Sequence, residues 1–86
     1  MPISKNWFIR FEPNVQTTQN TILFNRVSGE LFEVTEVYYD CINSLRIGVD
    51  FQALLMEKYA VNAGDVIDVE DTILKNLISL GVILNE

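Results

Sequence analysis

Three short segments in the first forty residues show the apolar pattern of β-strands. Residues 7–11 (WFIRF) form the first predicted strand, which stops at Pro13 because proline lacks the donor that a central strand needs. Residues 21–26 (TILFNR) and 29–34 (GELFEV) form the second and third predicted strands. A tight connection separates these two strands, and Gly29 is free to take a positive φ in it. We therefore predict that the second and third strands pair as an antiparallel hairpin.

After the third strand, the spacing of apolar residues changes from every second position to every third or fourth position. This spacing predicts helices at about residues 36–45, 50–59 and 63–80. Thr35 precedes the first helix and suits an N-cap, because its hydroxyl can accept a hydrogen bond from an early helical N–H. Asn62 holds the same position before the third helix, and an acidic residue follows three positions later, close to a capping box.

Glycines mark the ends of two predicted helices. Gly48 ends the first helix, and Gly81 stands at the C′ position after the third helix. The apolar residues 82–84 that follow are expected to fold back onto the core. The order of these elements predicts one α+β domain over residues 1–86, in which a three-stranded antiparallel sheet is followed by three helices in a winged helix-turn-helix-like arrangement.

The charge of the chain limits the partners that we expect. Twelve Asp and Glu against six Lys and Arg give a net charge of −6 over 86 residues, and the basic residues are scattered. Because binding to a polyanion depends on clustered Lys and Arg, we expect no nucleic-acid partner and no membrane partner. A neutral or basic peptide is compatible with this balance.

Hydropathy and cysteine content indicate a cytoplasmic protein. No apolar run approaches the ~18 residues of a transmembrane helix. The N-terminal residues lack the apolar region of a secretory signal. The chain has a single cysteine, Cys41, which cannot form an internal disulfide, so a reducing cytoplasm is the expected compartment.

The composition also argues against an enzyme. The chain has no histidine, which disfavours a zinc site and excludes a Ser-His or Cys-His nucleophile. Cys41 shares an apolar helix face with Ile42, which indicates a buried core thiol rather than a reactive one. Acidic residues gather near the start of the third helix, where they suit the helix dipole better than a metal site: Asp65, Asp68, Glu70 and Asp71. We therefore expect no catalytic residue, no metal and no cofactor.

The third predicted helix carries more apolar surface than its docking onto a core requires. One apolar stripe is enough to dock it and consists of Val66, Ile73, Leu77 and Leu80. A second stripe is flanked by Asp71 and Lys75 and consists of Ile67, Leu74 and Ile78. Either the second stripe packs on the hairpin or the C-terminal tail, or it forms one wall of a groove.

The third predicted strand is the candidate for the other wall. It contains Glu30 and Glu33 but no lysine or proline that would block its backbone, whereas natural edge strands are usually blunted. An open strand edge beside an apolar helix face suits β-augmentation, in which a peptide is added to the sheet as a further strand. The alternative is that residues 7–11 pair with this edge and cover it.

The order and spacing of these features resemble the PqqD-like family, the leader-peptide-binding domains called RiPP recognition elements. The resemblance covers residues 22–83 and runs through the segments ILFNRVSGELFEVTEVYYDCINSL, LLMEKYAV and TILKNLISLGVI. Its shared positions are a hairpin glycine, an aromatic strand residue, the step into the first helix, a Y-x-V after the second helix and the end of the third. These correspond here to Gly29, Phe32, Val34-Thr35, Tyr59-Ala60-Val61, Leu74, Leu77, Gly81 and Val82.

The resemblance implies a function without catalysis in bacterial peptide natural-product biosynthesis. Such domains bind the leader of a ribosomally made precursor peptide as an added strand and deliver it to a radical-SAM protein, a cyclase or a leader peptidase. The resemblance implies that the pairing backbone belongs to Glu30, Leu31, Phe32, Glu33 and Val34. It implies that the opposite helix wall consists of Ile67, Asp71, Leu74, Lys75 and Ile78.

Two other functions remain open at this point. The first is a winged-helix DNA-binding regulator, which would need a basic recognition helix that residues 63–80 do not supply. The second is a small structural subunit that uses the same strand edge for dimerisation. Phe32 and Val34 are also candidates to face the core, in which case only their backbone could take part in pairing.

Overall fold

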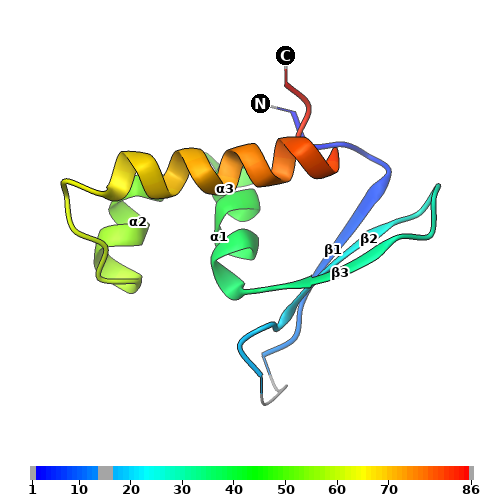
Figure 1. Ribbon diagram of the computed structural model, residues 1–86, viewed down its shortest axis with the longest axis horizontal. Coiled ribbons are helices and arrows are strands. Elements are labelled where there is room, and N and C mark those ends of the chain that lie inside the picture. The colour runs from blue at the N-terminus through cyan, green and yellow to red at the C-terminus, as the bar shows by residue number, and fades with distance from the viewer. Residues whose placement is uncertain (1, 14–16, 86) are drawn as a thin grey trace.

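The computed structural model describes residues 2–13 and 17–85, and it contains a three-stranded antiparallel sheet followed by three helices, as the sequence predicts (Figure 1). The strands are β1 (Trp7–Phe11), β2 (Thr21–Asn25) and β3 (Leu31–Val34). The helices are α1 (Glu36–Ile47), α2 (Phe51–Lys58) and α3 (Val66–Leu80). Of the helices that the structure describes, none is long and apolar enough to cross a membrane.

β2 is the central strand, because the strands lie in the order β1-β2-β3. Leu23 of β2 is opposite Ile9 of β1 on one side and opposite Phe32 of β3 on the other. The hairpin between β2 and β3 is confirmed, and Gly29 takes a φ of 80° in its turn. β1 pairs with β2 rather than with β3, so the outer edge of β3 is not covered by residues 7–11.

The core lies between the inner face of the sheet and the three helices. Leu23, Ile42, Leu55 and Leu77 bring β2 and all three helices into one buried cluster. α1 contacts both β1 and β2. Phe32 and Val34 of β3 are half-buried and pack against this cluster, whereas Leu31 and Glu33 alternate with them and are exposed. The side chains of Phe32 and Val34 therefore face the core.

α1 begins where the sequence predicts and ends two residues later than predicted. Thr35 is at the N-cap position, but its hydroxyl accepts no cap hydrogen bond. Gly48 ends the helix with a φ of 75°, and its N–H donates to the Ser44 carbonyl at 2.8 Å. A side-chain cap is present instead at α2, where the Asp50 carboxylate accepts from two backbone N–H groups.

The predicted start of α3 is wrong by three residues. Asn62 does not cap a helix; its carbonyl accepts the N–H of Asp65 at 2.9 Å, which closes a tight turn. α3 begins after this turn, with Asp65 at its N-cap. The segment contains Gly64, and glycine in a helix costs about 1 kcal/mol relative to alanine, which favours a turn over a further helical turn.

Val82 and Ile83 of the C-terminal tail fold back onto the core, as predicted, whereas Leu84 is exposed. Gly81 takes a φ of 86° after α3, and Val82 and Ile83 are fully buried. Ile3 forms an antiparallel β-bridge with Ile83, which ties the two ends of the chain together (Figure 1). The N–H of Ser4 donates to the Val82 carbonyl at 2.8 Å.

Candidate functional site

The outer edge of β3 is open within the part of the chain that the structure describes. The N–H of Asn25 donates to the Glu30 carbonyl at 2.8 Å, so this pair marks a hydrogen-bonded position of the β2–β3 ladder. Bonded and non-bonded pairs alternate in an antiparallel ladder. Phe32 and Val34 therefore bond to β2, and Leu31 and Glu33 direct their N–H and C=O groups outward. Of the five residues that the resemblance implies for pairing, Leu31 and Glu33 are therefore the two with outward backbone groups.

An apolar groove of about 580 Å³ opens where β3 leads into α1. Apolar side chains from α1, α2, α3 and the segment after α2 line it: Val37, Leu55, Val61, Val69 and Ile73. Polar residues and Tyr59 complete its wall: Thr17, Thr18, Asn20, Thr35, Glu36 and Tyr59. This volume is within the range of about 300–1,000 Å³ that is usual for ligand pockets.

Two smaller hollows continue along α3. One, of about 250 Å³, adjoins the groove at Val69 and Ile73. The other, of about 260 Å³, separates Val34 of β3 from the C-terminal half of α3, and we call it the wedge. Its lining residues are Val34, Tyr38, Asn76, Ser79 and Leu80. The Asn76 amide donates to the Tyr38 hydroxyl at 2.8 Å, which holds α3 against α1 at the wedge.

α3 turns a different face toward β3 than the resemblance implies. Val69, Ile73, Asn76 and Leu80 are spaced three or four residues apart, so they share the helix face that lines the groove and the wedge. Five residues that the resemblance implies for the helix wall line neither the groove nor the wedge: Ile67, Asp71, Leu74, Lys75 and Ile78. These five residues therefore lie outside the helix face that Val34 of β3 meets across the wedge.

The five implied wall residues fall into two groups. Leu74 and Ile78 are half-buried and pack against the core, and Ile67 is 66% exposed. Asp71 and Lys75 are exposed and form an ion pair with each other at 2.7 Å, one helical turn apart. Because this surface is turned away from β3, a single peptide strand on β3 would not reach it.

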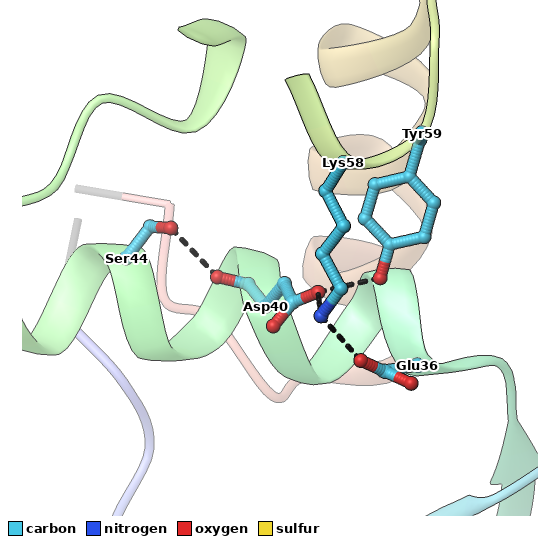
Figure 2. Close-up of polar contacts among 5 residues, drawn as sticks. All are labelled: Glu36, Asp40, Ser44, Lys58 and Tyr59. Carbon is cyan, nitrogen blue, oxygen red and sulfur yellow. Dashed lines mark hydrogen bonds and ion pairs between the residues drawn. The ribbon is translucent and has the colours of Figure 1, made fainter. Parts of the chain in front are cut away.

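A polar cluster ties the end of α2 to the first turns of α1 beside the groove. Figure 2 shows the Lys58 ammonium between the carboxylates of Glu36 and Asp40, with Asp40 at 2.8 Å. The Tyr59 hydroxyl donates to the same Asp40 carboxylate, and the Ser44 hydroxyl donates to the Asp40 carbonyl at 2.7 Å. Hydrogen bonds to Asp40 and Glu36 raise the pKa of Lys58 above its usual value. Burial and the bond to Asp40 raise the pKa of Tyr59, so the phenol stays protonated as a donor.

This cluster gives the groove a fixed wall, since Glu36 and Tyr59 also line the groove. Neither residue was a predicted site residue. Glu36 and Asp40 are one helical turn apart, so the sequence placed two carboxylates on one face of the first helix. Their partner Lys58 is 18 residues away from Asp40, and that contact depends on how the helices pack.

Cys41 is a core thiol, as predicted, and is 1% exposed. Burial, with a smaller effect of the nearby Glu70 carboxylate, raises the pKa of Cys41 to about 12. The thiolate is therefore not populated near neutral pH, and the thiol has little nucleophilic reactivity. Within residues 2–13 and 17–85, no group of three or more His, Cys, Asp or Glu side chains is arranged to hold a metal ion.

We predict that the free energy of unfolding falls as the pH rises from about 9 toward 12. The pKa of Cys41 is raised in the fold from 9.0 to about 12, so its stabilising effect is complete below pH 9 and is lost as the pH rises. Lys58 and Tyr59, whose pKa values are also raised, act in the same direction at higher pH. Urea unfolding at several pH values measures the decline, and the variant Cys41→Ala should show a shallower decline just above pH 9. An equal slope in both proteins would contradict this assignment.

Comparisons of the chain with models of known protein families, with curated proteins and with solved structures find no match.

Proposed function

We propose that this chain is a non-catalytic peptide-binding protein. It captures the leader of a ribosomally made precursor peptide by strand addition and delivers it to a modifying enzyme. The observation that carries the proposal is the open edge of β3 next to the apolar groove. The resemblance to PqqD-like domains supplies the identity of the peptide.

The edge and the groove supply different parts of the recognition. Leu31 and Glu33 each offer one outward N–H and one outward C=O, so an antiparallel peptide can form up to four main-chain hydrogen bonds with them. These bonds do not depend on the side chains of the peptide. The wedge, which Val34 of β3 lines, lies on the core side of this edge, where alternate side chains of an added strand would point. The groove opens just beyond the end of β3, at Thr35. Main-chain pairing thus supplies affinity, and the hollows select the sequence.

β1 also has an outer edge, but its surroundings are less suitable. No residue of β1 lines the groove or the wedge. The chain before β1 is tied to the C-terminal tail through Ile3 and Ser4, and Pro13 follows the strand. The ring of Phe11 stacks on Tyr39 of α1 at 5.2 Å between centroids. A peptide on β1 would therefore gain main-chain bonds without pockets for its side chains.

We also propose that the arrangement is winged helix-turn-helix-like, with α2 and α3 as the helix pair. A DNA-binding function gains no support from this arrangement. The exposed surface of α3 presents Asp68 and Asp71, and its one cation, Lys75, is paired with Asp71. Recognition helices on DNA carry excess positive charge instead.

An amide NMR titration tests the proposal. The ligand is the N-terminal half of a precursor peptide encoded beside the gene of this chain. We expect shifts at residues 30–35 and at Val69, Ile73, Asn76 and Leu80, with a Kd on the order of micromolar, about −8 kcal/mol. Matched exposed positions on the other side of α3, Ile67 and Lys75, should shift little. Shifts confined to that other side, or no binding at tens of micromolar, would reject the proposal.

A further inference from the structure

The sheet has a second face that the proposed function does not use. Side chains alternate along each strand, so Phe8, Ile22, Phe24 and Leu31 point away from the core that Trp7, Leu23 and Phe32 join. Phe8 is 42% exposed and Leu31 is 54% exposed. The Arg26 guanidinium lies over the Phe8 ring at 5.6 Å from the ring centroid, and residues between β1 and β2 border Ile22 and Glu33 in a shallow hollow. We call this surface the outer sheet face and define it by Phe8, Arg10, Ile22, Phe24, Leu31 and Glu33.

The strand register arranges the outer sheet face in two rows. Phe8 is opposite Phe24, which is opposite Leu31, so one row is entirely apolar. Arg10 is opposite Ile22, which is opposite Glu33, so the next row has a cation at one end and an anion at the other. The two ends of a row are two strand spacings apart, about 10 Å. Arg10 pairs with Glu12 of its own strand end rather than with Glu33.

We propose that the outer sheet face mediates a symmetric dimer of this chain. The two sheets stack face to face, and the twofold axis runs between them, parallel to β2. This symmetry places β1 of one copy over β3 of the other, and each row of one copy meets the same row of the other copy. Phe8 then meets the partner's Leu31, and Phe24 meets the partner's Phe24. Arg10 meets the partner's Glu33, and the symmetry repeats this charge pair on the other side. The face is thus complementary to itself in both its apolar and its charged rows.

The dimer is weak, because the face is small. Three strands of four or five residues cover less than the ~800 Å² per partner of a standard stable interface. We expect a dissociation constant of about 100 µM. Stacking of the sheets leaves the outward backbone groups of β3 free, since these point along the plane of the sheet. The inference is therefore independent of the proposed peptide binding.

Sedimentation velocity of the full chain, from about 10 µM to about 1 mM, measures the association. Arg10→Glu and Glu33→Arg each place two like-charge pairs in the dimer, and each should weaken it at least about tenfold. The double variant R10E/E33R exchanges the two ends of the row and should restore the dimer to within about threefold. Phe24→Glu, which brings two carboxylates together at the axis, should abolish it.

Val49→Glu is the matched control for added charge. Val49 is an exposed apolar residue between α1 and α2 and is not part of the outer sheet face, so its substitution should leave the association unchanged. Circular dichroism of each variant shows whether the fold is retained. If Phe24→Glu does not fold, the charge-reversal variants of Arg10 and Glu33 still test the dimer. A wild-type chain that stays monomeric at 1 mM overturns the proposal. A dimer that survives Phe24→Glu, or one that R10E/E33R does not restore, overturns it as well.

Discussion

Replacing Leu31 with proline is expected to weaken peptide binding by more than about tenfold. The Leu31 N–H points away from β2, so its loss breaks no bond within the sheet and removes one of the two outward donors of the edge. Proline is tolerated at an edge position of this kind. Fluorescence anisotropy with a labelled leader peptide gives the affinity, and circular dichroism shows whether the fold is intact.

Two further variants separate the donor from the side chain and from the fold. Leu31→Ala keeps the N–H and should retain most of the affinity. Phe32→Pro removes a donor that bonds to β2 and should destabilise the protein itself. If a folded Leu31→Pro protein binds the peptide as well as the wild type does, the peptide does not pair with this edge. Equal losses in Leu31→Ala and Leu31→Pro would assign the effect to the side chain.

Leu77→Ala is expected to lower the free energy of unfolding by about 2–5 kcal/mol. Leu77 is fully buried at the centre of the core, and its truncation leaves a cavity that the neighbouring helices cannot fill. Since small domains are stable by only about 5–15 kcal/mol, this is a large fraction of the total. Urea unfolding followed by circular dichroism measures the change.

Ile67→Ala is the matched control on the same helix. Ile67 is 66% exposed, so its truncation should change the unfolding free energy by no more than about 0.5 kcal/mol. The pair of variants tests which face of α3 is buried, because the face that contains Leu77 is buried and the face that contains Ile67 is not. A loss at Ile67 as large as that at Leu77 would contradict this orientation of the helix.

The elements of the fold could be predicted from local patterns. Alternation over residues 7–11, 21–26 and 29–34 and helical spacing after Thr35 each depend on a few neighbouring residues. The start of α3 was missed because a tight turn at Asn62–Asp65 carries the same polar residues as a capping box. The strand order could not be read locally, since an alternating pattern shows which face is buried but does not show which edge is paired.

The candidate site could be predicted only in part. The absence of Lys and Pro in residues 29–34 indicated an edge that nothing in its own sequence blocks, but only the strand order shows that residues 7–11 leave it uncovered. The side of α3 that lines the hollows could not be predicted, because polar Thr72 and Asn76 interrupt its apolar stripe, whereas Ile67, Leu74 and Ile78 form a cleaner apolar pattern. The groove itself combines five separate segments of the chain, and its shape depends on how the helices pack.

Hydrogen exchange of the β3 amides, measured by NMR with and without the leader peptide, shows whether the peptide is added to the sheet at this edge. The free protein should show fast exchange at Leu31 and Glu33 and slow exchange at Phe32 and Val34, which bond to β2. Bound peptide should slow exchange at Leu31 and Glu33 and leave Phe32 and Val34 nearly unchanged. Saturated binding with no added protection at Leu31 and Glu33 would contradict strand addition at this edge.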